Sequence, residues 1–212
     1  MKIALIGATG FVGSAALAEL LARGHTITAI ARDTTKIAPA PNLTVKQVDV
    51  NDVDALADAA RGNDVVISTF NGGWSNPDIY NAHVNGSRAI HAATKKAGVR
   101  LIAVGGAGSL YAPDGSQFVD GPDFPAEYKA GAKAARDALS EAKAAGGDDW
   151  TFVSPPFTIA PGERTGKYRT ALDQPVFDAN GESKISVQDF AVALADEAEK
   201  PTHKGQRFTV GY

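Results

Sequence analysis

Cysteine is absent from the 212-residue chain, and its four histidines show no spacing typical of a metal site. The sequence therefore excludes disulfide bonds and thiolate chemistry, and it predicts no metal centre. Basic residues are not in excess, because the formal net charge is -3, so a general attraction to nucleic acid or anionic membranes is not expected. No stretch approaches eighteen apolar residues, and no signal peptide is recognisable. We expect a cytoplasmic protein.

The remaining composition is that of a globular domain. Hydrophobic residues make up 44% of the chain and charged residues 21%, a balance that differs from that of disordered chains. A length of 212 residues suits one domain. Neither an internal repeat nor a low-complexity linker divides the sequence, so we expect residues 1–212 to form a single domain.

Short apolar runs alternate with segments of helical periodicity up to Ser154. The apolar runs predict strands at 2–7, 25–31, 43–48, 64–69, 100–104 and 150–154. The periodic segments predict helices at 11–23, 52–60, 79–97 and 127–145. This alternation is typical of an α/β fold of the Rossmann type, in which a doubly wound, mainly parallel sheet carries helices on both faces.

The alternation stops after Ser154, and a loop-rich stretch covers about residues 155–185. Short strands are expected near 165–170 and 183–185. Ser186 and Asp189 have the spacing of a capping box for a helix at 187–199, and a last strand is expected at 206–210. Because loops at the carboxyl ends of such strands bind ligands, we interpret 155–185 as a small substrate-covering lobe.

The stretch LIGATGFVG places three glycines directly after the first predicted strand and at the start of the first helix. A tight turn, close approach of a pyrophosphate and helix–strand packing each favour glycine there. The helix N-terminus also offers free N–H groups and a partial positive charge to phosphates. The pattern therefore predicts a dinucleotide-binding turn made of Gly7, Ala8, Thr9, Gly10, Phe11, Val12 and Gly13.

The end of the second predicted strand bears on the choice of dinucleotide. Folds that prefer NAD usually carry an acidic residue there to bind the ribose hydroxyls. This chain has Arg32 instead, and a guanidinium can bind the 2′-phosphate of NADP(H) with two hydrogen bonds. We therefore predict a preference for NADP(H), while the neighbouring Asp33 keeps NAD(H) possible.

Loops after the later strands supply further candidates for cofactor binding. Asp49 and Val50, after the third strand, could hold the adenine through the carboxylate and the apolar side chain, although Asp49 could equally cap a helix. The segments after the fourth and fifth strands are small and glycine-rich where the backbone must pass close to the cofactor. Their candidate residues are Thr69, Phe70, Asn71, Gly72, Gly105 and Gly106.

Three segments together carry a resemblance to a known family: GATGFVG, the GGAGSL after the fifth strand, and the run DWTFVSPP with the later GERTGKYR. The chain resembles the NAD(P)H-binding, NmrA-like and flavin reductase-like branch of the atypical short-chain dehydrogenases. The resemblance implies a Rossmann fold and a nicotinamide cofactor bound at Gly7–Gly13. It also implies that the segment of Ser154, Pro155, Pro156 and Phe157 lies near the nicotinamide.

The catalytic residues of short-chain dehydrogenases are only partly matched. These enzymes use a serine with Tyr-x-x-x-Lys, in which the tyrosine donates a proton and the lysine lowers its pKa. Ser109 is the candidate serine, but Tyr128 and Lys133 are five residues apart rather than four. Lys129 occupies the tyrosine position, which leaves Tyr128 rotated by about 100° on the helix. Tyr111 is an alternative proton donor.

An incomplete catalytic set favours acceptors that need little acid catalysis. A flavin or quinone delocalises the incoming charge and can take its proton from water, whereas a ketone requires a positioned acid. Loop aromatic residues could form an apolar acceptor pocket, and the candidates are Trp74, Phe118, Phe124, Phe157 and Tyr168. We expect the substrate to contact Trp74, Ser109, Tyr111 and Phe157.

The sequence thus predicts an NADPH-dependent oxidoreductase that transfers hydride to a small planar or carbonyl acceptor, either flavin, quinone or ketone. A non-catalytic NADP(H)-sensing regulatory protein is the alternative, and an epimerase or dehydratase acting on sugar nucleotides is a third reading. We expect a monomer or homodimer whose partner is the small-molecule acceptor.

Overall fold

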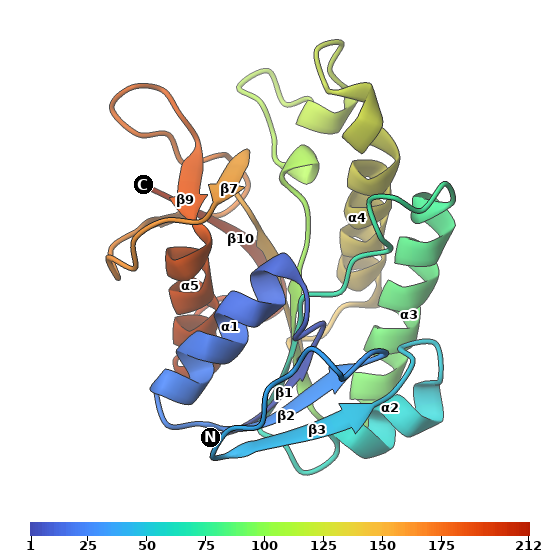
Figure 1. Cartoon of the computed structure of the whole chain (residues 1–212). Coiled ribbons are helices and arrows are strands. Elements are labelled where there is room, and N and C mark those ends of the chain that lie inside the picture. The colour runs from blue at the N-terminus through green and yellow to red at the C-terminus, as the bar shows by residue number, and fades with distance from the viewer.

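The computed structural model describes residues 1–212 and has an eight-stranded sheet at its centre (Figure 1). Six strands precede the loop-rich segment: β1 Lys2–Ile6, β2 Thr26–Ala31, β3 Leu43–Gln47, β4 Val65–Ser68, β5 Arg100–Val104 and β6 Trp150–Ser154. The later strands are β7 Thr158–Ala160, β8 Arg169–Ala171, β9 Lys184–Ser186 and β10 Gln206–Gly211. The helices are α1 Phe11–Ala22, α2 Val53–Ala60, α3 Ile79–Ala97, α4 Ala126–Ala145 and α5 Val187–Glu199, with short 3-10 turns η1 Ala107–Ser109 and η2 Phe118–Asp120.

The strand order in the sheet is β3-β2-β1-β4-β5-β6-β10-β8. All neighbouring pairs are parallel except β10 with the edge strand β8. Helices α1 and α5 cover one face and α3 and α4 the other (Figure 1). The predicted Rossmann-type fold is confirmed, and so are the six strands and four helices predicted up to Ser154, to within one residue at each end. No helix has both the length and the hydropathy needed to cross a membrane.

Both faces of the central strands β1, β4 and β6 are buried, so these strands have buried residues at successive positions, whereas the edge strands β3 and β8 are largely exposed. In β1, Ile3 and Leu5 join the core formed with α1 and α5, whereas Ala4 and Ile6 join the core formed with α2 and α3. Beneath α4, Trp150 forms a third, smaller cluster with Phe152, Leu139 and Ala142. This arrangement fixes the register of the parallel strands, and it aligns their carboxyl ends along one edge of the sheet.

The turn after β1 requires glycine at two positions for different reasons. Gly7 has φ +82°, and a Cβ on it would lie 2.7 Å from the Thr69 hydroxyl. A Cβ on Gly13 would lie only 2.0 Å from the carbonyl oxygen of Gly7. Helix α1 therefore packs directly on the end of β1, as the sequence predicts, with no side chain between them. Gly10 has ordinary backbone angles and more space, since its Cβ would lie 3.3 Å from the same oxygen.

The loop-rich segment is attached to the sheet by a buried carboxylate. Asp189, which is fully buried, accepts hydrogen bonds from the Thr165 hydroxyl at 2.6 Å, the Gly166 amide at 2.7 Å and the Tyr212 hydroxyl at 2.7 Å. Burial opposes ionisation, but these hydrogen bonds hold the pKa of the Asp189 carboxyl below its usual value. The amide of Asp189 also donates to the Ser186 hydroxyl, so the predicted cap of α5 is confirmed.

Two short strands in this segment complete the lobe. β7 pairs in parallel with β9, and β9 leads directly into α5. Strands were expected near 165–170 and 183–185. β9 lies one residue later than expected, β8 overlaps only the end of the first range, and β7 was not expected. At the other end of the lobe, the Arg164 guanidinium donates two hydrogen bonds of 2.7 Å to Glu19 on α1.

The contact between Gly13 and Gly7 yields a prediction about stability. Gly13→Ala should lower the free energy of unfolding by about 3 kcal/mol or more, because the methyl group must displace helix α1 from β1. Gly10→Ala is the matched control, and its cost should be about 1 kcal/mol or less. Urea denaturation of both variants checks this. Equal, small effects for the two substitutions would contradict the packing described for the turn.

Candidate cofactor site and acceptor cleft

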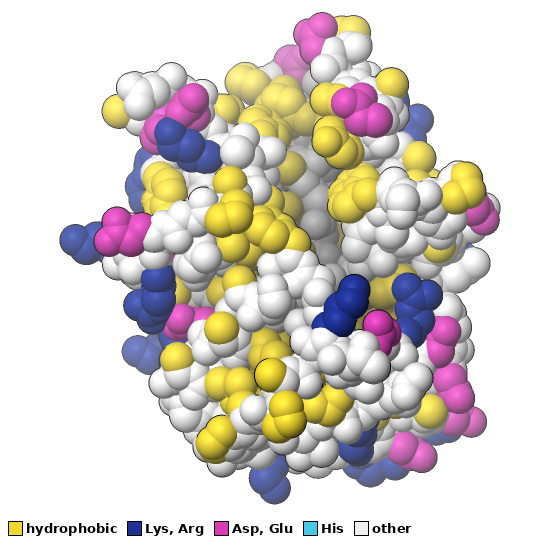
Figure 2. All heavy atoms as spheres, in the orientation of Figure 1, with side chains coloured by type: hydrophobic (Ala, Val, Ile, Leu, Met, Phe, Trp, Pro, Cys, Tyr) yellow, Lys and Arg dark blue, Asp and Glu magenta, His cyan; other side chains and the backbone are white.

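The carboxyl ends of the parallel strands bring the predicted site residues to one edge of the sheet. The loops after β1, β2, β4, β5 and β6 follow parallel strands and therefore lie along this same edge. Figure 2 shows that the surface is hollowed there, between the lobe of β7 and β9 on one side and the ends of α3 and α4 on the other. Hydrophobic side chains line both sides of this hollow, which we call the cleft. Ligands of open α/β sheets bind at this edge.

The N-terminus of α1 opens toward the cleft without any side-chain cap. The first α-helical hydrogen bond runs from the Ser14 amide to the Gly10 carbonyl at 2.8 Å, which leaves the amides of Phe11, Val12 and Gly13 ahead of it. No acidic residue lies in the first turn to compete for these donors. Gly7 and Gly13 hold this helix start directly against the end of β1, because a Cβ on either would collide with Thr69 or with the Gly7 carbonyl. The residues present therefore fit a diphosphate held by backbone amides.

Arg32 lies on the surface directly after β2 and makes no ion pair or hydrogen bond with the protein. Its neighbour Asp33 is turned to its own loop, where one carboxylate oxygen accepts from the Thr35 amide at 3.0 Å and the Thr35 hydroxyl at 2.5 Å. These bonds keep the pKa of Asp33 below its usual value. The guanidinium is thus free to bind an anion, whereas one oxygen of the nearby carboxylate is already occupied.

Residues after β3 and β4 mainly shape the backbone of the site. Asp49 accepts hydrogen bonds from the amide and the side chain of Asn51, both at 2.9 Å, and Val50 is buried in the core. The Thr69 hydroxyl donates to the Ile6 and Gly7 carbonyls at 2.9 and 3.2 Å. Thr69 therefore supports the glycine turn, and Val50 offers little surface to an adenine ring.

The glycines after β4 and β5 lie where neighbouring groups leave no room for a side chain. A Cβ on Gly72 would lie 2.8 Å from the His83 amide nitrogen, and one on Gly105 would overlap the ring of Phe152 at 1.7 Å. Gly106 is less tightly enclosed, with Ala135 at 3.2 Å. Asn71 accepts from the Gly73 amide at 2.7 Å. These segments form a smooth backbone wall, as expected for the loops beside a bound dinucleotide.

One aromatic group lies at the carboxyl end of β6. The Phe157 ring is 44% exposed and contacts Phe118 with ring centroids 4.7 Å apart and Phe177 at 6.2 Å. Pro156, just before Phe157, is buried, and so is Ser154, whose hydroxyl has no hydrogen-bond partner in the protein. Phe177 was missed by the sequence analysis, although it is an aromatic residue in an otherwise polar loop.

A second aromatic group lies at the start of α4. Trp74 is 58% exposed and meets Tyr128 edge to face at a centroid distance of 5.4 Å. The indole lies over Gly131, where a Cβ would come within 2.7 Å of it. Phe124 packs instead against Gly108, and the Tyr168 hydroxyl donates to Asp196 on α5 at 2.5 Å. Neither Phe124 nor Tyr168 belongs to these two groups.

The structure does not assemble the catalytic trio of short-chain dehydrogenases. Ser109 is fully buried, and its hydroxyl donates to the Gly106 carbonyl at 3.0 Å. Tyr128 is half exposed on the side of α4 that carries Gly131. Lys133 is rotated from it by about 140° and makes no ion pair or hydrogen bond. The three side chains therefore do not converge on one reacting atom.

A buried arginine that the sequence analysis missed holds the loop after β5. Arg207 on β10 is 2% exposed and donates to Asp173 from Nε at 2.9 Å, and from Nη1 to the Ser109 carbonyl and hydroxyl at 3.2 Å. Its guanidinium lies 5.8 Å from the centroid of the Tyr111 ring. Arg207 thereby ties the loop of Ser109 and Tyr111 to the covering lobe. In the sequence, the one signal for this role of Arg207 is a charged residue within a predicted, mostly apolar strand.

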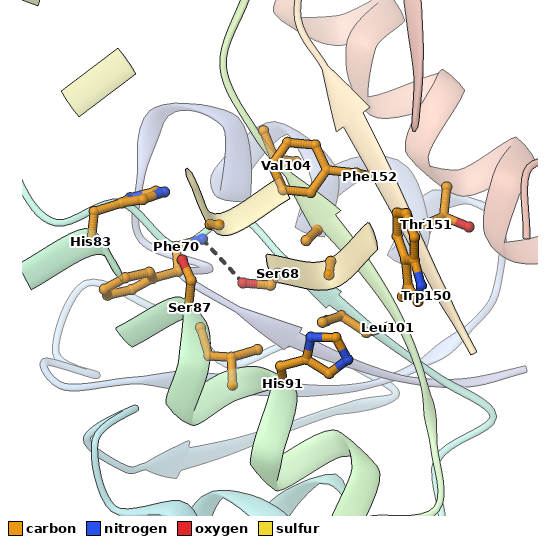
Figure 3. Close-up of a pocket in the computed structure, with 14 residues that line it drawn as sticks. Ser68, Phe70, His83, Ser87, His91, Leu101, Val104, Trp150, Thr151 and Phe152 are labelled. Atoms are coloured by element: carbon orange, nitrogen blue, oxygen red, sulfur yellow. Dashed lines mark hydrogen bonds between the residues drawn. The ribbon is translucent and has the colours of Figure 1, made fainter. Parts of the chain in front are cut away.

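A small, partly open cavity of about 40 Å³ lies between the sheet and helices α3 and α4 (Figure 3). His83, Ser87 and His91 of α3 face Ser68 and Trp150 of the sheet across it. The cavity is too small for a nicotinamide ring, so it is separate from the cofactor site. His83 is 5% exposed, its Nδ1 has no partner, and burial lowers its pKa to about 4.

This burial predicts a pH dependence of stability. His83 is neutral when folded and titrates near 6.5 when unfolded, so protonation favours the unfolded chain, and stability falls as the pH drops from 6.5 toward 4. Wild type should lose about 2 kcal/mol more than His83→Phe between pH 7 and pH 4.5. Urea denaturation at both pH values measures the difference. Parallel losses in the two proteins would contradict the account of His83.

Comparison with known proteins places this site in a family. Residues 7–198 match the family described as NAD(P)H-binding. The Bacillus subtilis uncharacterized protein YwnB is 36% identical over 99% of this chain and 98% of its own length. A Bacteroides thetaiotaomicron structure, provisionally named an epimerase, is 41% identical with a TM-score of 0.91, covering 100% of this chain and 96% of its own.

A Streptococcus pneumoniae structure, provisionally named an NADH-flavin reductase, is 34% identical with a TM-score of 0.87 over 100% of this chain and 99% of its own. The two structures thus share one fold, although their names give different activities. What they share with this chain is the overall fold, over nearly the full length of each chain. The chain belongs to the NAD(P)H-binding family, whose ligand is a nicotinamide cofactor.

Proposed function

We propose that this protein is an oxidoreductase that uses NADPH to reduce a planar aromatic acceptor, a flavin or a quinone. The observation that carries the proposal is the combination of an uncapped α1 N-terminus with two exposed aromatic groups at the same edge of the sheet. The names of the Streptococcus pneumoniae and Bacteroides thetaiotaomicron relatives include both a flavin reductase and an epimerase. The choice between these activities therefore depends on the residues of this chain.

The preference for NADPH is supported by the groups after β2. Arg32 is exposed and unpaired, whereas Asp33 is partly occupied by Thr35. A free guanidinium can bind a 2′-phosphate, and a carboxylate directed to the ribose would repel it. Lys36, also exposed on this loop, adds positive charge nearby.

The preference for a flavin or quinone is supported by the absence of a positioned acid. Ser109 is buried, and Tyr128 and Lys133 project from different sides of α4. Bound NADPH supplies the hydride, and the contribution of this chain is to stack the acceptor, orient it and exclude water. Phe157 and Trp74 offer exposed rings for stacking. A conjugated acceptor needs no side-chain acid, because its own ring system takes up the charge.

Substitution of Arg32 tests the cofactor preference. Arg32→Gln should weaken NADPH binding about tenfold to a hundredfold, because a charge-assisted bidentate contact is lost. NADH binding should change by less than about threefold. Arg61→Gln, on the surface beyond α2, is the control and should change neither. Calorimetric titration provides the affinities, and equal losses for NADPH and NADH would refute the assignment of Arg32.

A turnover assay tests the reaction itself. NADPH oxidation should be detected with riboflavin or menadione and should be much slower with simple ketones. Phe157→Ala should raise the KM for these acceptors without weakening NADPH binding, because it removes a stacking surface. Tight NADPH binding without turnover of any flavin, quinone or ketone would contradict the enzyme and favour a non-catalytic sensor of NADP(H).

A further inference from the structure

The two loops at the acceptor side of the cleft contain acidic residues but no basic ones. Two loops form the rim above the aromatic group of Phe118, Phe157 and Phe177: residues 111–125, between β5 and α4, and residues 177–183, before β9. Together they contain five carboxylates and no Lys or Arg: Asp114, Asp120, Asp123, Asp178 and Glu182. We call these two loops the acidic rim. Figure 2 shows acidic side chains at the top of both sides of the hollow.

Basic groups from outside the two loops offset part of this charge. Arg136 pairs with Asp120 at 3.1 Å, and Lys184 pairs with Asp178 at 3.3 Å and also with Glu182. Arg169 reaches the carbonyl oxygens of Phe177 and Tyr212. Five carboxylates thus face three basic groups, and the acidic rim keeps a net charge of about two negative units.

Two of the five carboxylates have no basic partner. Asp123 makes no ion pair or hydrogen bond, and Asp114 accepts only from the amide and hydroxyl of Ser116, at 2.9 and 2.6 Å. The hydrogen bonds from Ser116 hold the pKa of Asp114 below its usual value, so this carboxylate stays charged at neutral pH. In the first turns of α4, the charges of Glu127 and Lys129 cancel each other.

The opposite end of the cleft has the other sign of charge. The free amides of α1 and the guanidinium of Arg32 lie where the phosphates of the dinucleotide are expected. Phosphate is therefore attracted at the adenosine end and repelled at the acceptor end. An acceptor that carried its own phosphate would meet the repulsive end of this field.

We propose, on the basis of the oxidoreductase function above, that the acceptor is an uncharged planar aromatic molecule without phosphate, and that the acidic rim selects riboflavin-like or quinone-like compounds over flavin nucleotides. Coulomb's law in water gives about twofold in affinity for each pair of unit charges roughly 10 Å apart. A phosphate dianion facing about two net charges makes four such pairs, or about sixteenfold without salt. Screening lowers this to about fivefold at roughly 0.02 M ionic strength and to very little at high ionic strength.

The test compares riboflavin with FMN, which share one ring system and differ by a phosphate. With saturating NADPH, kcat/KM for riboflavin should exceed that for FMN about fivefold at roughly 0.02 M ionic strength, and the two should converge above about 0.5 M. Fluorescence titration of NADP⁺-loaded protein with each flavin gives the same comparison without turnover. Equal values for the two flavins at low ionic strength, or binding of neither flavin, would overturn the proposal.

Substitution of the two unpaired carboxylates assigns the effect to the acidic rim. Asp114→Asn with Asp123→Asn should raise kcat/KM for FMN so that it comes within about twofold of riboflavin, while riboflavin itself is unchanged. Asparagine can still accept the Ser116 hydrogen bonds. Asp148→Asn with Asp149→Asn is the control of equal charge, because these exposed residues lie before β6 at the opposite edge of the sheet. It should leave the ratio unaltered.

The possible failures of the two proposals can be told apart. If the flavins bind with the expected preference but are not reduced, the oxidoreductase function fails while the acidic rim still selects against phosphate. If both flavins are reduced equally well at low ionic strength, the oxidoreductase function stands and the selectivity is wrong. If the ratio responds equally to the double variant and to its control, the acidic rim is not the cause.

Discussion

The architecture depends on a contact between backbone atoms at the end of β1. Gly13 sits against the carbonyl of Gly7 so closely that a methyl group would overlap it, and this brings the first turn of α1 directly onto the sheet. The same contact positions the free amides of α1 at the carboxyl edge. Thr69 reinforces the turn from the neighbouring strand by donating to the carbonyls on either side of the strand end. Packing and phosphate recognition thus require the same absence of side chains.

Around this turn, the groups proposed to bind the cofactor and those proposed to bind the acceptor lie at different positions along the edge of the sheet. The β2 side carries the free guanidinium of Arg32, and the β5–β6 side carries the aromatic groups and the acidic rim. The covering lobe is held in place by buried polar contacts rather than by a core of its own. Asp189 fixes one loop of the lobe, and Arg207 connects the lobe to the loop of Ser109. The cleft is therefore built on a rigid frame, as stacking of a planar acceptor requires.

The sequence predicts what depends on local pattern. The glycine spacing, the alternation of strands and helices and the Ser186 cap of α5 are each encoded within a few residues, and the structure confirms them. The second half of the expected capping box does not form, because the Ser186 amide donates to Tyr212 instead of Asp189. Contacts between distant segments could not be predicted in the same way. Arg207 meets Ser109 across 98 positions of the chain, and β7 finds its partner only after the loop of Arg164 and β8 have passed. A single sequence has no signal for such pairs.

The candidate site likewise has parts that local sequence predicts and parts that depend on contacts between distant segments. The glycine turn and the loops after β4 and β5 could be placed from their spacing. The spacing of residues on α4 did not reveal which side of the helix faces the protein. Helical geometry predicts that Tyr128 and Lys133 diverge, and neither belongs to the buried side of α4. Phe177 joins Phe157 only because the covering lobe folds back on the end of β6. The aromatic cleft is therefore a product of tertiary structure.

The most direct measurement of the central claim is the response of individual backbone amides to NADP⁺, recorded as nitrogen–proton correlation spectra of the isotope-labelled protein. The account predicts that the amides of Phe11, Val12 and Gly13 show the largest shifts, and that 2′,5′-ADP, which lacks the diphosphate bridge, leaves them much less affected. If NADP⁺ binds while these three amides stay unshifted, the helix N-terminus does not hold the diphosphate, and the account is wrong.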